Sequence, residues 1–306
     1  MSFRSSLRVD YAVRTRCFAW LAVCAISMLA ACTQAPLLGV LPQPQLSRLS
    51  RLLPADTLLL GEQHDAKEHQ QLQRQMVEWL AAKGTLAALT LEMAPRGKDT
   101  RALTPTASES QVRAALDWNE AGWPWDTYGP VVMTAVRAGI PVVGANLPTT
   151  QQRSAMQDST LDQRLPPAAL LTQKERIREG HCGLLPETQI LPMARIQVAR
   201  DISMAQSIEQ ALQPGRTVLL IAGNNHVERG MGVPAHLPAH INVKVISAKA
   251  GASSDRAASA PKEHQDLAAD MIWPTAASPA KDYCAQMRQM WRAAPSATGK
   301  TPAQQQ

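Results

Sequence analysis

The stretch Asp56-Thr-Leu-Leu-Leu-Gly-Glu-Gln-His64 decides the fold of this chain. Its apolar run has no alternation with polar residues and ends at a glycine, so it predicts a short strand that is buried on both faces. Residues 66–83 follow with apolar side chains at helical spacing and a glycine just beyond them, which predicts an amphipathic helix. Asp65 and Glu68 have the spacing of a capping box at the start of that helix.

The same alternation of apolar runs and amphipathic segments continues along the chain. Further strands are predicted at 86–91, 140–145, 217–222 and 241–246, with helices at 131–138 and 192–212. Apolar strands separated by helices predict an α/β fold with a mostly parallel central sheet, covered by helices on both faces. Residues 100–128, rich in Ser and Thr and then in Trp, are predicted to form a helical insert or lid.

Charge and composition exclude two classes of protein. The 306 residues contain 31 Lys and Arg against 25 Asp and Glu, and charged residues make up 18%. This content excludes disorder across the whole chain. Half of the net charge of +6 lies in residues 1–31, where four arginines accompany one aspartate, so nucleic acid is not an implied partner.

The first residues are typical of a secretory signal. Residues 17–29 are an apolar run that is too short for a permanent membrane span, and Leu29-Ala-Ala-Cys32 has the pattern of a bacterial lipobox. We expect a signal peptide at 1–31 and acylation of Cys32, although an ordinary cleaved signal beside a chance cysteine is the alternative. Because Thr33 rather than aspartate follows, the outer membrane is favoured. A tether at 32–50, one domain at 51–293 and a disordered tail at 294–306 complete the prediction.

Two cysteines, Cys182 and Cys284, remain after the signal and the acylated residue are set aside. In an oxidising compartment they form one disulfide, remain buried free thiols, or leave Cys182 as a soft ligand beside His181. The sequence alone leaves these alternatives open.

Polar side chains follow the ends of the predicted strands. They are Glu62, His64, Glu92 and His226, with Asn146 and Asn224 beside them. Because the carboxyl ends of parallel strands meet at one edge of a sheet, we expect these groups to lie together. Two carboxylates and two imidazoles suit a divalent metal, with one glutamate as general base and the metal activating water. Each residue by itself also suits a helix cap or a structural network.

A set of motifs in the chain resembles the ChaN-type lipoproteins, which are related to the Tiki, TraB and erythromycin-esterase group. The resemblance covers residues 56–284 and departs from the family at Asn225. The motifs that carry it are Gly61-Glu-Gln-His64, Leu91-Glu-Met93, Trp125-Asp-Thr-Tyr128, Ala145-Asn146, Gly180-His-Cys182, Gln197-Val-Ala-Arg-Asp-Ile-Ser-Met204 and Gly223-Asn-Asn-His226.

The resemblance implies haem binding through a tyrosine ligand, with a pair of stacked haems in a dimer. Tyr128 is then the preferred axial ligand, because tyrosinate suits ferric haem and the tryptophans around it could cover a porphyrin. His181 is the alternative ligand. Arg200 binds a haem propionate or pairs with Asp201. No Cys-X-X-Cys-His spacing is present, so covalent haem attachment is excluded.

The leading hypothesis is a lipid-anchored haem-binding protein of bacterial iron acquisition at the outer membrane. Its expected partners are haem, the membrane, a second copy of the chain and an outer-membrane haem receptor. The main alternative is a metal-dependent hydrolase or peptidase of the Tiki type, acting through Glu62, His64, Glu92 and His226. A weaker alternative is an interaction protein whose polar cluster has no chemistry.

Overall fold

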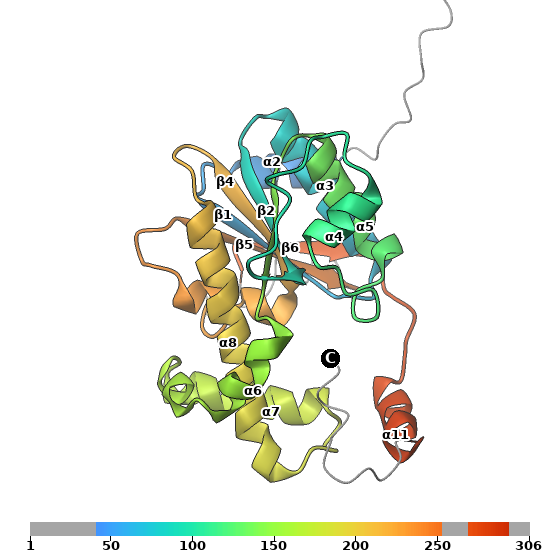
Figure 1. The fold of residues 1–306 in the computed structure, drawn as a ribbon, viewed down its shortest axis with the longest axis vertical. Coiled ribbons are helices and arrows are strands. Elements are labelled where there is room, and N and C mark those ends of the chain that lie inside the picture. The colour runs from blue at the N-terminus through green and yellow to red at the C-terminus, as the bar shows by residue number, and fades with distance from the viewer. Residues whose placement is uncertain (1–40, 253–268, 294–306) are drawn as a thin grey trace, which may run out of the picture. The chain divides into compact units, whose positions relative to one another are not determined.

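The computed structural model describes residues 41–252 and 269–293 (Figure 1). The predicted signal peptide, Cys32, the first part of the tether and the predicted tail at 294–306 lie outside the described residues. Within the described ranges, no helix combines the length and the apolar character that crossing a membrane requires.

A single open sheet of six parallel strands forms the centre of the domain, in the order β3-β2-β4-β1-β5-β6. The predicted fold class is therefore confirmed. The strands are β1 (Thr57–Glu62), β2 (Leu86–Pro95), β3 (Val142–Asn146), β4 (Thr217–Gly223), β5 (Val243–Ala250) and β6 (Met271–Thr275). The edge strand β6 was not predicted, because it is short and contains Pro274, a residue that sheets tolerate at their edges.

Both faces of the sheet are covered by helices. Leu58 and Leu60 of β1 belong to the larger core cluster, with α3 (Lys67–Ala82) and α5 (Trp125–Arg137). Leu59, between them, belongs to a second cluster, with α8 (Glu187–Ala211). Successive side chains of a strand point to opposite faces, so each face is buried under its own helices. Figure 1 shows α3 and α5 on one side of the sheet and α8 on the other.

The Trp-rich insert covers the α3 and α5 face. It contains one short helix, α4 (Glu109–Ala115), which begins at a capping box between Ser108 and Gln111. Trp118 and Trp123 pack partly buried against the larger core cluster. The following helix α5 begins at Trp125, six residues earlier than predicted, and therefore takes Tyr128 into the core.

Two local predictions at the start of the domain are wrong. Residues 43–50, predicted as part of a tether, form helix α2 (Gln43–Ser50), which places Leu49 fully in the core. Asp65 does not cap α3, because that helix begins at Lys67 after Ala66 and lacks a side-chain cap. The carboxylate of Asp65 instead accepts hydrogen bonds from the distant side chains of Tyr283 and Lys281.

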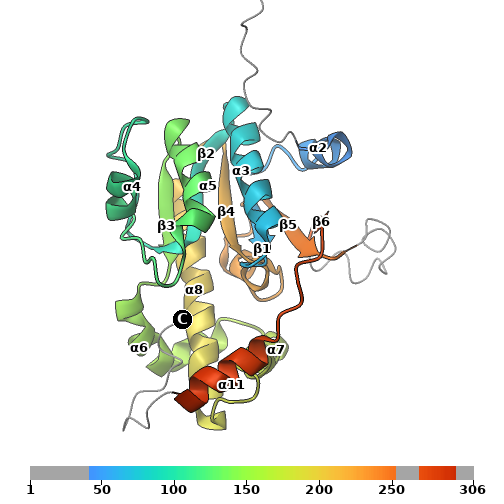
Figure 2. The ribbon, with the colours of Figure 1, turned by 90° about the vertical axis from the view of Figure 1, so that its right-hand side faces the viewer.

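The remaining helices extend beyond the carboxyl ends of the strands (Figures 1 and 2). They are α6 (Thr149–Gln157), α7 (Pro167–Gly180) and α11 (Tyr283–Ala293), with the 3₁₀ turns η1 (Ser159–Gln163) and η2 (Asn224–Val227). A third 3₁₀ turn, η3 (Val233–His236), packs against α8. A disulfide joins Cys182, just after α7, to Cys284 in the first turn of α11, with the Cα atoms 5.5 Å apart. The structure thus contains the bridge that was one of the open alternatives for these two cysteines.

Candidate functional site

Two carboxylates at the carboxyl edge of the sheet point to opposite faces. Glu62 follows Leu60 by two residues in β1, so it shares the face that α3 and α5 cover. Glu92 follows Leu91 by one residue in β2, so it faces α8. The predicted cluster therefore has a Glu62 side (Glu62, His64, Gln70, Gln73, Tyr128) and a Glu92 side (Glu92, Asp201, Gly223, His226). The two sides meet at Gly223, where a β-carbon would lie 3.0 Å from Nε2 of His64 and 3.7 Å from Oε2 of Glu92.

Neutral donors and one imidazole surround the carboxylate on the Glu62 side. The Oε2 atom of Glu62 accepts hydrogen bonds from the Nε2 atoms of Gln73 and Gln70, the latter at 3.1 Å. Its Oε1 atom accepts from the Tyr128 hydroxyl and lies beside Nδ1 of His64, both at 2.8 Å. Both carboxylate oxygens are thus satisfied although Glu62 is buried.

His64 is the accessible member of the Glu62 side, because 44% of its side chain is exposed. Its ring meets the ring of Trp123 edge-on, with the centroids 5.0 Å apart. Partial burial lowers the pKa of His64, but the hydrogen bond to Glu62 and the charges of Glu92 and Glu62 outweigh it and raise this pKa above 6.5. A β-carbon at Gly223 would lie 3.0 Å from Nε2 of His64, so glycine there gives the ring its space.

Tyr128 is a hydrogen-bond donor in this structure, and its role as an axial haem ligand stays a prediction. Its side chain is buried and donates to Glu62. Burial and the neighbouring carboxylate raise the pKa of the Tyr128 phenol far above its usual value. Tyr283 is no better, because its hydroxyl donates to Asp65 and this bond raises the pKa of Tyr283 to about 12.

The Glu92 side contains charged partners and is buried more deeply. Glu92 accepts a hydrogen bond from the backbone N–H of Gly223 at 2.7 Å, and its Oε1 atom lies 3.4 Å from Nε2 of His226. The other ring nitrogen of His226 lies 2.6 Å from Oδ1 of Asp201 on α8. Burial lowers the pKa of His226, but the charges of Glu92 and Asp201 raise it to about 10, so the ring is an imidazolium.

The two carboxyl groups of the Glu92 side respond in opposite directions. For Glu92, burial raises the pKa, but the charge of His226 and the hydrogen bonds lower it well below 4.5. Burial dominates at Asp201 and raises its pKa to about 6. Because all three groups share protons, these values describe the cluster rather than one residue.

The geometry does not support the metal site that the hydrolase alternative requires. Within the described residues, no three His, Cys, Asp or Glu side chains are placed to hold one metal ion. His226 has Asp201 at one ring nitrogen and Glu92 at the other, so it has no lone pair directed at a free position. Glu62, for its part, is enclosed by four donors on the other face.

Arg200 lies on α8 beside the Glu92 side. Burial lowers the pKa of its guanidinium, while the charges of Glu92 and Asp201 raise it. Of the two roles predicted for Arg200, this position favours the electrostatic support of buried carboxylates over contact with a haem propionate.

His181 has the geometry of an orientated ligand. It follows the last residue of α7, and its Nδ1 atom lies 2.8 Å from the carbonyl oxygen of Ile177. A carbonyl can only accept, so Nδ1 carries a proton, and in a neutral ring Nε2 then carries the lone pair. Such a backbone contact is the arrangement that commonly fixes the ring of a metal-ligating histidine.

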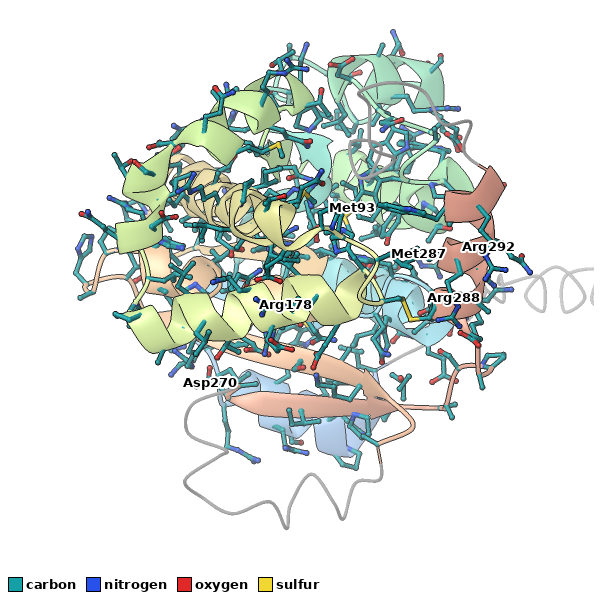
Figure 3. All side chains as sticks on the ribbon, turned by 90° about the horizontal axis from the view of Figure 1, so that it is seen from below. Met93, Arg178, Asp270, Met287, Arg288 and Arg292 are labelled. Atoms are coloured by element: carbon teal, nitrogen blue, oxygen red, sulfur yellow. A yellow bond between two sulfur atoms is a disulfide. The ribbon has the colours of Figure 1, made fainter. Side chains whose placement is uncertain are left out.

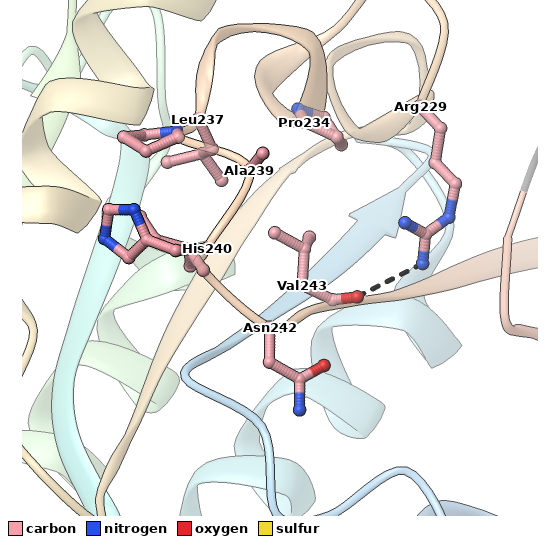
Figure 4. A pocket seen from close by; sticks show the side chains of 9 residues that line it. Arg229, Pro234, Leu237, Ala239, His240, Asn242 and Val243 are labelled. Atoms are coloured by element: carbon pink, nitrogen blue, oxygen red, sulfur yellow. Dashed lines mark hydrogen bonds between the residues drawn. The ribbon is translucent and has the colours of Figure 1, made fainter.

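A shallow hollow of about 440 Å³ lies elsewhere, around residues 229–243 (Figure 4). It adjoins the amino end of β5, whereas the candidate site follows the carboxyl ends of the strands. Arg229 in its wall donates to the carbonyl of Val243 and pairs with Asp270. The hollow therefore has no part in the site.

Sequence reasoning missed several residues of the site. Gln70 and Gln73 are three residues apart and so lie on one face of α3, but nothing in the sequence linked that face to Glu62. Trp123 was assigned to the insert as a group, without its contact to His64. Asp201 was named only as the partner of Arg200, and its bond to His226 was not foreseen.

The fold and the residues at the carboxyl edge of the sheet define a class of protein. It is an α/β domain with a parallel sheet and with Glu and His residues at or just after the ends of its strands. Within that class, residues 48–237 match the model of the family described as haem-binding uptake, Tiki superfamily, ChaN. The chain belongs to this family. No curated protein matches it.

Solved structures with a similar fold include ChaN of Campylobacter jejuni, for which cofacial heme binding is described. It is 21% identical with a TM-score of 0.56, and the match covers 69% of this chain and 88% of that chain. A Bacillus cereus protein is 14% identical with a TM-score of 0.39, covering 69% and 70% of the two chains. The type III effector HopBA1 is 14% identical with a TM-score of 0.40, covering 73% and 88%.

Proposed function

We propose that this chain binds haem and that His181 supplies the axial ligand to the iron. Membership of a haem-binding family supports the cofactor. The hydrogen bond from Nδ1 of His181 to the Ile177 carbonyl carries the choice of ligand, because it leaves Nε2 free to bind a metal. Neutral imidazole is a common axial ligand of haem iron, and bound haem would supply redox-active iron.

The other candidate ligands fit less well. Both tyrosines donate to carboxylates, so each would have to lose a proton that its surroundings stabilise. Burial lowers the pKa of His64, but the hydrogen bond to Glu62 and the charges of Glu92 and Glu62 raise it overall, so a proton competes with iron for this ring. The side chain of His64 is partly exposed beside Trp123, so it is placed to meet a ligand at the edge of the sheet.

His64 and His181 belong to one region through the start of α11. Tyr283 donates to Asp65, the residue after His64. Cys284, the next residue along, is bonded to Cys182, the residue after His181. The two histidines therefore flank the first turn of α11, which supports a binding site between the edge of the sheet and α7.

A haem titration tests the proposal. The purified protein should develop a Soret band with one or more haems, and His181→Ala should weaken binding roughly a hundredfold or more. Tyr128→Phe should leave the spectrum unchanged. His240→Ala removes an exposed histidine beside the hollow at residues 229–243 and is the matched control. A normal spectrum in His181→Ala would overturn the assignment of the ligand.

We further propose that the chain serves iron acquisition as a lipoprotein of the outer membrane. The arginines before a short apolar run and the Leu-Ala-Ala-Cys32 motif support the anchor, and Thr33 supports the outer membrane. Transfer of haem from an outer-membrane receptor, and a dimer with stacked haems, fit this role. Cys32→Ala should release the protein from membranes or block its maturation, and a variant that still carries acyl chains by mass spectrometry would exclude the anchor.

A further inference from the structure

The helices α2, α3 and α5 form one layer over the sheet, and all three end where the strands begin. Leu49 of α2, Leu80 of α3 and Val136 of α5 belong to the same core cluster. Three to six residues separate the end of each helix from the strand that follows it. Because the strands are parallel, their starts share one edge of the sheet, and the three helix ends lie at this amino edge. Figures 1 and 2 show α2 at the opposite end of the domain from α7 and α11.

Exposed cations gather at these three helix ends. They are Arg48 and Arg51 at the end of α2, Lys83 just after α3 and Arg137 at the end of α5, and we call them the amino-edge surface. Among the described residues, no acidic side chain forms an ion pair with any of the four. Arg137 donates only to backbone carbonyl oxygens, so its charge is not compensated there.

Acidic side chains near this surface are engaged with other groups. Glu78 of α3 pairs with Arg74, and Asp270 before β6 pairs with Arg229. Asp56, just before β1, accepts a hydrogen bond from a backbone N–H. The amino-edge surface therefore presents positive charge to the solvent, whereas the buried carboxylates of the candidate site lie at the opposite edge of the sheet.

The chain reaches α2 from the proposed anchor over a short distance. Leu41 follows Cys32 by nine residues, and an extended chain of that length spans at most about 30 Å. Leu41 is buried in the same core cluster as Leu49 of α2, so the described domain begins next to this helix. An acylated Cys32 would therefore hold the amino-edge surface within reach of the bilayer.

We propose that the amino-edge surface docks on an anionic lipid surface beside the anchor, so that the candidate site faces away from the membrane. The inference rests on the proposed lipid anchor. An anionic bilayer attracts each Lys or Arg at its surface, and the attraction falls off within about 10 Å at 0.1 M salt. A lipid tether alone leaves the domain free to turn, whereas cations on three helix ends favour one orientation. In that orientation a ligand can approach the carboxyl edge from the aqueous side.

Hydrogen exchange of the acylated lipoprotein in vesicles tests the orientation. The protein is reconstituted in vesicles of phosphatidylcholine alone and of phosphatidylcholine mixed with phosphatidylglycerol. In low salt, amides of residues 43–52 and 81–86 should exchange at least about threefold more slowly on the anionic vesicles. The difference should disappear in about 0.5 M NaCl, because salt screens the attraction. Amides of α6 and α11 should exchange equally on both kinds of vesicle.

Removal of the cations is the first variant. Arg48→Gln/Arg51→Gln/Lys83→Gln should abolish the slower exchange on anionic vesicles. Cations at the carboxyl end of a helix also favour the helix dipole, so urea denaturation of the same preparation is measured alongside. A loss of stability with unchanged lipid dependence would assign these cations to the helices alone and overturn the docking surface.

The matched control removes three exposed cations from the other end of the domain. Figure 3, which views that end, shows two of them, Arg288 and Arg292, on α11, and the third is Arg153 on α6. Arg153→Gln/Arg288→Gln/Arg292→Gln has the same change in net charge and should retain the slower exchange on anionic vesicles. Equal loss in both triple variants would show that net charge rather than this surface acts, and would overturn the proposal.

The remaining outcomes separate this inference from the anchor on which it rests. Equal exchange on both kinds of vesicle, with the acyl chains on Cys32 confirmed by mass spectrometry, overturns the docking surface and leaves the anchor intact. Slower exchange of α6 or α11 on anionic vesicles would reverse the orientation and overturn it as well. Absence of acyl chains overturns both proposals. Protection that follows protein concentration instead of phosphatidylglycerol would show that a second copy covers the surface, and would also overturn the proposal.

Discussion

The Glu62 side and the Glu92 side stabilise a buried carboxylate in different ways. Glu62 is surrounded by two amides, a phenol and a partly exposed imidazole. Glu92 instead faces the imidazolium of His226, whose other ring nitrogen is paired with the buried carboxylate of Asp201. The first arrangement leaves its imidazole partly open to solvent, whereas the second encloses all of its charged groups.

This difference separates the part of the edge that can meet a ligand from the part that supports the fold. His64 is accessible and has a raised pKa, so ligand charge and pH can act on it. His226 is buried between two carboxylates, so changing its charge should mainly change stability. The following predictions test that division.

The largest effect is expected on the Glu92 side. His226→Ala leaves Glu92 and Asp201 buried without the imidazolium between them, and should reduce the free energy of unfolding by about 3–5 kcal/mol. Urea denaturation measures the loss. His240→Ala, at an exposed position, should stay within about 0.5 kcal/mol of the parent protein. A loss below about 1 kcal/mol in His226→Ala would show that the charges of this side are not coupled as described.

The pH dependence of stability should come from the same residue. The folded-state pKa of His226, about 10, lies above its unfolded value of 6.5. Its stabilisation is therefore complete below about pH 6.5 and is lost as the pH rises through 10, with a slope of at most about 1.4 kcal/mol per pH unit. Unfolding at pH 7 and pH 9 should differ by roughly 2 kcal/mol, and by less in His226→Gln. A free energy that rises between these two pH values would contradict the assignment.

The raised pKa of Asp201 acts in a lower window. Its folded-state value of about 6 lies above the unfolded value of 3.8, so its contribution declines between about pH 4 and 6. Measurements at pH 7 and above therefore lie above the window in which this contribution declines.

The sequence predicted the strands of the site well, because each of them is an apolar run that ends before a polar residue. It could not predict that Glu62 and Glu92 face opposite sides. Leu60 and Leu91 point to the same face of the sheet, and side chains alternate between the two faces along a strand. Glu62 lies two residues after Leu60 and shares its face, whereas Glu92 lies one residue after Leu91 and points to the opposite face. The strand-end residues do lie at one edge, where His64 and Glu92 both approach Gly223, but they belong to two hydrogen-bond networks, and the metal site is not supported among the described residues.

Other differences arose where a distant segment competed with a local signal. Asp65 and Glu68 have the spacing of a capping box, but both carboxylates accept hydrogen bonds from the segment that follows β6. Asp65 accepts from Tyr283 and Lys281, and Glu68 accepts from the backbone N–H of Ala276. Those contacts join residues more than 200 positions apart, so no local pattern could reveal them.

The Glu62 side should respond to mutation less than the Glu92 side. Tyr128→Phe removes one of four donors to Glu62 and no charge, so the free energy of unfolding should fall by about 1–2 kcal/mol. The haem spectrum should be unchanged, because the phenol is not the proposed ligand. Urea denaturation and a Soret titration on one preparation measure both effects. A lost Soret band with normal stability would restore Tyr128 as the axial ligand.

The smallest effect is expected at Asp65, whose carboxylate joins the Glu62 side to α11. Asp65→Asn removes the ion pair with Lys281 and weakens the bond from Tyr283, both at exposed positions, so the free energy of unfolding should fall by less than about 1 kcal/mol. The disulfide still holds Cys284, so α11 should stay attached and exchange its amide hydrogens only slightly faster. Asp282→Asn is the matched control, because it changes only the carboxylate that accepts from the backbone N–H of Ala285 at the start of α11. Asp56→Asn would not serve, because Asp56 accepts a hydrogen bond from the backbone N–H of Asn242. If Asp65→Asn proved as destabilising as His226→Ala, solvent exposure would not explain the difference in stability between the Glu62 side and the Glu92 side.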